Sequence, residues 1–106
     1  MGITKSQKFT EEQNSLAQIA KVLGHPARIA ILEHIVKSRA CICNDLVDEI
    51  GLAQATISQH LKELKNLGII SGTIEGKSMC YCINKEKWQQ IQSDLSRFFM
   101  DINICC

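Results

Sequence analysis

The sequence predicts a mostly helical fold with one small β-hairpin: a winged helix-turn-helix with an added C-terminal helix. Apolar residues recur at helical spacing before residue 68 and again after residue 85, whereas the period changes to two over residues 69–83. Two of the helical segments are separated by a turn of only three or four residues. So short a turn forces the two helices to cross steeply, as a helix-turn-helix requires.

Length and composition favour a single folded domain. The chain has 106 residues, which is near the lower end of the size at which a chain buries an adequate core alone. Its hydrophobic content of 45% is ordinary for a globular protein. It has no apolar run of about 18 residues and no apolar secretory signal at its start, so we expect a cytoplasmic protein without a membrane partner. In the cytosol its six cysteines are expected to be reduced. The net charge of +1 argues against strong non-specific DNA binding.

Capping residues delimit the first two helices. Thr10, followed by two acidic residues, is typical of an N-cap, and Gly24 supplies a stop, which predicts a helix over about residues 10–24. Pro26 suits the first position of a second helix. The apolar residues of that helix cover much of its circumference, so we expect it to be central and buried. They are Ile29, Ile31, Leu32, Ile35 and Val36.

The helix-turn-helix is predicted over about residues 44–66. A short helix from about Asn44 ends at Gly51, and the next runs from about Gln54 to Asn66. The inward positions of the second of these helices are Ile57, Leu61 and Leu64.

A wing and a final helix are predicted next. Strands at 69–74 and 78–83 flank a tight turn and form the wing, residues 69–83. On its second strand Met79, Tyr81 and Ile83 share one face, which leaves Cys80 and Cys82 on the other. The final helix, about residues 85–104, carries an apolar stripe made of Trp88, Ile91, Leu95, Phe98, Phe99 and Ile102.

The free faces of the helix at 54–66 carry short or amide-bearing polar side chains, as a recognition helix does. Gln59 can bond an adenine bidentately, and Thr56 can offer its methyl group to thymine. Ser58, Lys62 and Lys65 are expected to hold phosphates. A solvated helix face would look similar, but the steep turn before it and the hairpin after it favour DNA binding. The predicted DNA-binding residues are Gln54, Thr56, Ser58, Gln59, His60, Lys62, Lys65 and, at the tip of the wing, Lys77.

Five segments follow one another at familiar spacings: LGHPARIAIL at 23–32, CICNDL at 41–46, LAQATISQHLKEL at 52–64, LGII at 67–70 and Gly-Lys at 76–77. Together they closely resemble the ArsR/SmtB family of dimeric, metal-responsive winged-helix repressors, over about residues 10–100. The resemblance implies a transcriptional repressor and not an enzyme. It also implies a homodimer built on the first and last helices, a short palindromic operator, and release of DNA when an inducer binds.

The thiol pair Cys41 and Cys43 is the sharpest chemical motif. Two thiolates at this spacing, entering a helix whose N-terminus favours the thiolate form, can chelate one soft ion. Trivalent arsenic or antimony takes three thiolates, and the family's arsenic sensors often place the third cysteine three residues after the pair, where this chain has Leu46. The family's cadmium and lead sensors add a cysteine from the N-terminal arm, but residues 1–40 contain none.

The remaining candidates for the third thiolate are Cys105 and Cys106, which could reach the pair of the partner subunit if the last helices pair across a dimer. Cys80 and Cys82 are interpreted as structural or incidental, although their shared strand face could make a second site. The last helix has no histidine, which argues against the zinc site that the family places there.

Three functions remain open. The first is a repressor released by a thiophilic ion, As(III) or Sb(III) first and Cd(II) or another soft metal next. The second is the same repressor with a thiol-redox or polysulfide switch. The third is a thiol oxidoreductase or metal carrier, which would have no use for the polar helix face and the hairpin.

Overall fold

The computed structural model describes residues 8–38, 41–43, 46–75, 78–100 and 102, with the backbone alone at positions 43, 46–47, 73–75 and 78–79. The chain order is α2 (Glu11–Leu23), α3 (Pro26–Ser38), β1 (Ile42–Cys43), α4 (Leu46–Ile50), α5 (Gln54–Leu67), β2 (Ile70–Glu75), β3 (Ser78–Ile83) and α6 (Lys85–Met100). The predicted winged helix-turn-helix with an added terminal helix is confirmed. None of the described helices has the length and apolar character to cross a membrane.

The helix boundaries follow from the predicted caps. Thr10 Oγ1 accepts a hydrogen bond from the Gln13 backbone N–H at 3.0 Å, and Gln13 Oε1 accepts one from the Thr10 N–H at 2.9 Å. This reciprocal capping box starts α2. Pro26 is the first residue of α3, as expected. Gly68 ends α5 in the left-handed conformation, at φ +94°, with its N–H bonded to the Leu64 and Lys65 carbonyls.

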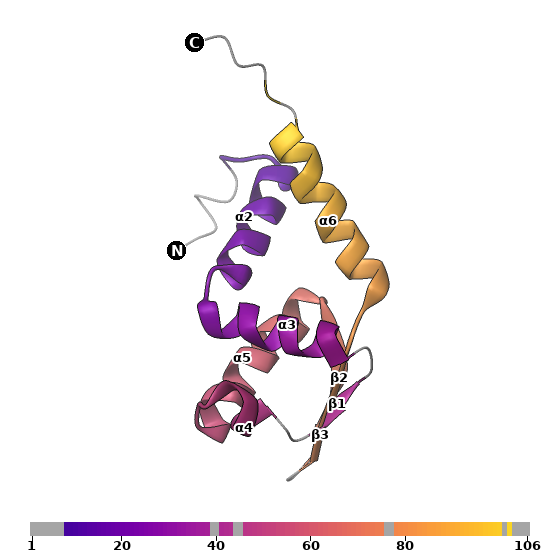
Figure 1. Ribbon diagram of the computed structural model, residues 1–106. Coiled ribbons are helices and arrows are strands. Elements are labelled where there is room, and N and C mark those ends of the chain that lie inside the picture. Colours follow the sequence, from indigo (N-terminus) through magenta and orange to yellow (C-terminus); the bar gives the residue numbers. More distant parts are fainter. Residues whose placement is uncertain (1–7, 39–40, 44–45, 76–77, 101, 103–106) are drawn as a thin grey trace.

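In Figure 1, α2 and α6 occupy the upper part of the molecule and approach each other at the top. The helix α3 crosses below them, and α4 and the sheet lie at the opposite end. The core lies where α2, α3, α5 and the sheet meet. The inward positions predicted for α5 are confirmed, because Ile57, Leu61 and Leu64 are fully buried. Against them pack apolar side chains from the other elements: Ile19, Val22, Ile31, Leu32, Ile35, Ile42, Ile69, Ile70, Tyr81 and Ile91.

The prediction that α3 is buried around its circumference is wrong at two positions. Ile31, Leu32 and Ile35 are buried, but Ile29 is 42% exposed and Val36 is 45% exposed. Within one chain α3 packs against the remainder of the fold with a single stripe, so the two side chains outside that stripe stay uncovered.

The sheet has three strands in the order β1-β3-β2, one more than the predicted hairpin. β2 pairs antiparallel with β3, from Ile70 opposite Ile83 to Glu75 opposite Ser78. β1 pairs antiparallel with the other edge of β3, with Ile42 opposite Tyr81 and Cys43 opposite Cys80. The predicted alternation on β3 is seen at Cys80, which is exposed, and Tyr81, which is buried, whereas Cys82 and Ile83 are both half-buried. The side chain of Met79 lies outside the description.

Candidate nucleic-acid interface and thiol site

The polar face predicted on α5 is exposed at most of its positions. The buried stripe of Ile57, Leu61 and Leu64 turns the opposite face to solvent, and along it lie Gln54, Thr56, Gln59, Lys62 and Lys65. Ser58 is half-buried, and its Oγ accepts a hydrogen bond from Gln54 Nε2 at 3.3 Å. Lys77, at the tip of the wing, lies outside the described residues.

His60 does not lie on that face. It is only 7% exposed, and Arg28 of α3 donates from Nε to His60 Nδ1 at 3.1 Å. Burial lowers the pKa of His60, and the neighbouring His25 and Arg28 lower it further. The predicted placement of His60 on the free face is therefore wrong, because it follows the buried Ile57 by three residues, nearly one helical turn, and so lies near the side that packs into the core. His60 is a buried link between helices.

The sequence contained no sign of the partners of His60. The His25 ring lies 4.4 Å from the His60 ring, centroid to centroid, although 35 positions separate them in the chain. Arg28 also donates from Nη1 to the Val22 carbonyl at 3.1 Å. These contacts depend on how α2, α3 and α5 pack, which periodicity within a single helix does not specify.

The thiol pair lies on a strand and not at the entrance of a helix, which corrects the sequence-based placement. Cys43 ends β1, and Cys41 directly precedes this strand, while α4 begins three residues after Cys43. The helix N-terminus is thus not the immediate neighbour of Cys41. A signal for the strand was present, because Cys41-Ile42-Cys43 repeats the pattern of Cys80-Tyr81-Cys82, an apolar residue between two cysteines.

β1 and β3 bring cysteines from distant parts of the sequence together. Cys41 and Cys82 form a disulfide, with their Cα atoms 4.3 Å apart, so the expectation of reduced thiols is wrong at these two positions. Cys80 is also disulfide-bonded, and its Cα lies opposite that of Cys43 in the strand register. Cys80 and Cys82, interpreted from the sequence as structural or incidental, thus belong to the same region as the thiol pair. Cys105 and Cys106 lie outside the described residues.

A cavity of about 470 Å³ opens beside the Cys41–Cys82 disulfide. Its wall is largely apolar, with Ile35 and Val36 from α3, Ile83 from the end of β3 and Trp88 from α6. Lys85, the first residue of α6, adds a cationic side chain. Trp88 is the single tryptophan of the chain, so all of the indole fluorescence comes from this wall of the cavity.

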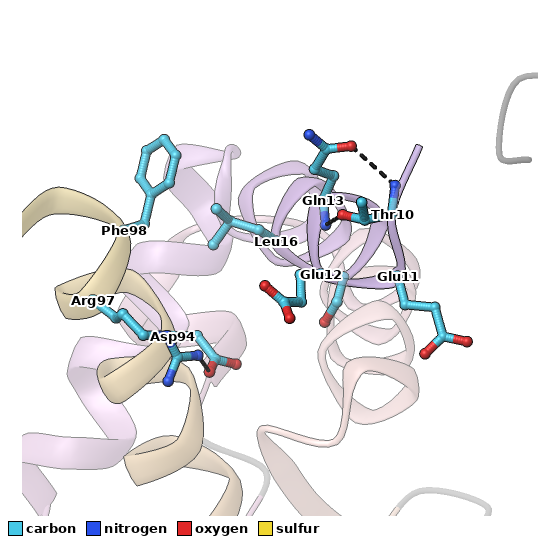
Figure 2. Close-up of a pocket in the computed structure, with 9 residues that line it drawn as sticks. Thr10, Glu11, Glu12, Gln13, Leu16, Asp94, Arg97 and Phe98 are labelled. Carbon is cyan, nitrogen blue, oxygen red and sulfur yellow. Dashed lines mark hydrogen bonds and ion pairs between the residues drawn. The ribbon is translucent and has the colours of Figure 1, made fainter. Parts of the chain in front are cut away.

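A second cavity, of about 670 Å³, separates the N-terminal part of α2 from the C-terminal part of α6. Figure 2 shows Leu16 of α2 and Phe98 of α6 facing this space, with the Asp94–Arg97 ion pair beside them. Beyond the cavity, exposed apolar side chains continue along α6 and past its end: Phe98 is 59%, Phe99 69%, Met100 80% and Ile102 68% exposed. So large an apolar surface on so small a chain is typical of an interface.

Comparison with known proteins gives the family. Residues 25–71 match the model described as bacterial regulatory protein, arsR family. The chain is 34% identical over 82 residues to an uncharacterized HTH-type transcriptional regulator of Methanocaldococcus jannaschii, which covers 76% of this chain and 91% of that protein. It is 32% identical over 92 residues to a cadmium resistance transcriptional regulatory protein CadC homolog of Staphylococcus aureus, covering 84% of this chain and 75% of the relative.

The similarity extends to longer regulators and to a solved structure. The chain is 34% identical over 68 residues to the HTH-type transcriptional repressor SmtB of Mycobacterium tuberculosis; the match covers 64% of this chain and spans about half, 50%, of that repressor's length. The crystal structure of M. tuberculosis Rv0081 superposes with a TM-score of 0.62 at 28% identity, over 88% of this chain and 97% of that one. The family model and these transcriptional regulators together show that the chain belongs to the ArsR family of bacterial regulatory proteins.

Proposed function

We propose that the protein is a cytoplasmic transcriptional repressor that binds operator DNA as a homodimer and leaves it when a thiophilic ion binds Cys41 and Cys43. As(III) or Sb(III) is the first candidate and Cd(II) the next. One observation carries the proposal: the thiol pair lies at β1, and this strand is the element that comes before α4, the first helix of the helix-turn-helix. An ion that draws the thiolates together acts on the segment that positions α5.

The exposed face of α5 supports DNA binding. Gln54, Thr56 and Gln59 lie in its first two turns, where a recognition helix meets base edges, and Lys62 and Lys65 follow for phosphates. No acidic residue lies in the first turn of α5, and its N-cap residue, Ala53, makes no side-chain hydrogen bond to it. The N-terminus of α5 therefore carries no acidic side chain that would repel a phosphate.

The apolar surface at the end of α6 supports the homodimer. Phe98, Phe99 and Met100 are more than half exposed, and the cavity beside them lies between the two helices that the family resemblance assigns to dimerisation. A second copy of the chain would remove these side chains from water and place two α5 helices on one operator.

The chemistry of the thiols supports a soft-ion inducer. Thiolates select thiophilic ions over magnesium or calcium. One relative is a cadmium resistance regulator, and another, 31% identical over 80 residues, is an arsenical resistance operon repressor of Staphylococcus xylosus. A coupling free energy of about 1–3 kcal/mol between inducer and operator would change the affinity for DNA roughly 5–150-fold.

A second candidate keeps the repressor but makes its switch oxidative. The Cys41–Cys82 disulfide favours it, because the two cysteines are already within bonding geometry. An oxidant such as a peroxide or polysulfide would then take the place of the metal ion.

The test is operator binding by reduced protein. A duplex enriched from a random library by the protein itself serves as the probe, and fluorescence anisotropy follows its release by arsenite, antimonite, cadmium or polysulfide. We expect arsenite or cadmium to release the wild type and to have no effect on the Cys41→Ser/Cys43→Ser variant. Release by polysulfide alone would establish the oxidative switch, and failure of every inducer would contradict both candidates.

A further inference from the structure

The pairing of β1 with β3 places the cysteines of two CxC motifs in two facing pairs. The register sets Cys43 opposite Cys80, and one step further along the strands Cys41 is bonded to Cys82. Between the members of each motif stands a buried residue, Ile42 at 6% and Tyr81 at 1% exposure. Because strand positions alternate between faces, the cysteine positions fall on the outer face of the sheet, where Cys41 and Cys80 are exposed and Cys82 is half-buried.

We propose that Cys41, Cys43, Cys80 and Cys82 of one chain form a single thiolate site for one thiophilic ion. This four-cysteine site rests on the proposed function and deepens it. It supplies the third sulfur that a trivalent ion needs, because Leu46 stands where a third cysteine would follow the thiol pair. A trivalent metalloid takes three of the four thiolates, and a divalent ion such as Cd(II) takes all four. No thiolate from a second chain is needed.

Occupation of the site requires the reduced state. A dithiol reductant opens the Cys41–Cys82 bond and, in the same way, the disulfide of Cys80: for each bond two electrons pass to the protein sulfurs, which take up two protons, and one reductant molecule is left as its own disulfide. On binding the ion, each ligating thiol releases its proton to solvent. Oxidation and metal binding therefore compete for the same sulfur atoms.

The neighbouring cavity suits such an ion. Trp88, Ile35 and Val36 form an apolar wall beside Cys41 and Cys82, which limits the access of water to one side of the sulfurs. Lys85 lines the same cavity, and a nearby ammonium group favours the thiolate form over the thiol.

The site lies where the two functional halves of the molecule are joined. β1 leads to α4 and hence to the helix-turn-helix, while β3 leads through the single residue Asn84 into α6. Asn84 holds that junction rigidly: its N–H donates to the Ile69 carbonyl at 2.9 Å, and its Oδ1 accepts from the Lys87 N–H at 3.2 Å. An ion that joins β1 to β3 thus couples α6 to the start of the helix-turn-helix.

The experiment is a cadmium titration of the reduced full chain without DNA, followed by thiolate-to-metal absorption and by Trp88 fluorescence. The matched variants are Cys80→Ser/Cys82→Ser and, as control, Cys105→Ser/Cys106→Ser. We expect one ion per chain, protection of four thiols from alkylation and a change in Trp88 emission. The variant on β3 should bind cadmium at least about tenfold more weakly, a loss of ~1.4 kcal/mol, with weaker thiolate absorption, whereas the control should match the wild type.

Unchanged affinity and absorption in Cys80→Ser/Cys82→Ser, or their loss in the control variant, would overturn the four-cysteine site. Circular dichroism and the thermal midpoint establish that each variant folds, and the single variants Cys80→Ser and Cys82→Ser provide the comparison if the double variant does not. Failure of the wild type to release DNA despite four-thiol cadmium binding would contradict the proposed function and leave this site standing.

Discussion

Arg28 donates a hydrogen bond from Nε to Nδ1 of His60 at 3.1 Å, and the same guanidinium donates to the Val22 carbonyl. One side chain of α3 therefore connects the end of α2 to the middle of α5. Since Nδ1 accepts, His60 is held as the neutral tautomer that carries its proton on Nε2. A second proton on the ring would have to sit on Nδ1, where it would point at the N–H group of Arg28 Nε.

This contact predicts that stability falls in mild acid. Because the pKa of His60 is lowered from 6.5 by burial, by His25 and by Arg28, the unfolded chain binds more protons than the folded chain between the two pKa values. The contribution of the neutral His60 ring to the free energy of unfolding is complete above about pH 6.5 and is lost as the pH falls through the pKa of His60 in the folded chain. Urea denaturation from about pH 7.5 to about 5 should show this fall.

His60→Gln removes the titrating ring, so its stability should vary less with pH over the same range. Lys62→Gln, at an exposed position of the same helix, is the matched control and should keep the slope of the wild type. Equal slopes in the wild type and His60→Gln would contradict the assignment of the fall to this imidazole.

Two exposed residues of α5 should affect DNA binding differently. Lys62→Gln is expected to weaken binding to all duplexes alike and to reduce the slope of log affinity against log salt by about 0.9, as for one lost phosphate contact. Gln59→Ala should instead relax the preference at one base pair, at a cost of about 1–3 kcal/mol for the preferred duplex. Anisotropy at several salt concentrations, on the enriched duplex and its single-base variants, separates the two effects.

Lys21→Gln, an exposed lysine near the end of α2, is the control for the loss of one positive charge. A salt slope lowered equally by Lys21→Gln and Lys62→Gln would mean that Lys62 acts only through the net charge of the protein.

Gly72→Ala should destabilise the sheet. Gly72 pairs with Tyr81 at φ +155°, and an added Cβ would collide with the Cys80 carbonyl. We expect a loss of about 1–3 kcal/mol, typical of a side chain in a backbone region open mainly to glycine. Ser71→Ala, at the exposed neighbouring position, should stay within about 0.5 kcal/mol of the wild type. Chemical denaturation measures both, and an unchanged Gly72→Ala would show that β2 pairs with β3 less closely than described.

Phe98→Glu should break the proposed homodimer. The ring is 59% exposed in the single chain, so the charge costs the monomer little, but burying an unpaired carboxylate in an interface costs several kcal/mol. Sedimentation equilibrium should show a monomer for Phe98→Glu and a dimer for the wild type and for Gln92→Glu, an exposed polar position of the same helix. A dimeric Phe98→Glu would place the interface elsewhere.

Local signals made most of the fold predictable. Thr10, Pro26 and Gly68 delimit helices through their own backbone or side-chain chemistry, and the spacing of Ile57, Leu61 and Leu64 is enough to orient α5. β1 was not predicted because the alternation of Cys41-Ile42-Cys43 is too short to indicate a strand by itself and its partner residues lie about 40 positions away. Its pairing, and not any property of the CxC motif alone, places Cys80 and Cys82 beside the thiol pair.

His60 shows a second limit. In the sequence it stands between Gln59, which is exposed, and Leu61, which is buried, at the boundary between the two faces of α5. Whether it faces solvent or the core depends on Arg28, 32 positions earlier, which supplies a buried donor for its ring. Long-range polar partners of this kind leave no periodic trace in a single sequence.

The left-handed turn at Gly68 has a mechanical consequence. A Cβ there would lie 3.6–3.8 Å from the Lys87 side chain, so the end of α5 rests on the first turn of α6. Through the Lys87 side chain a change in the tilt of α6 would reach the end of α5. In a two-fold assembly, a change in the tilt of the two α6 helices would therefore change the distance between the two DNA-facing α5 helices.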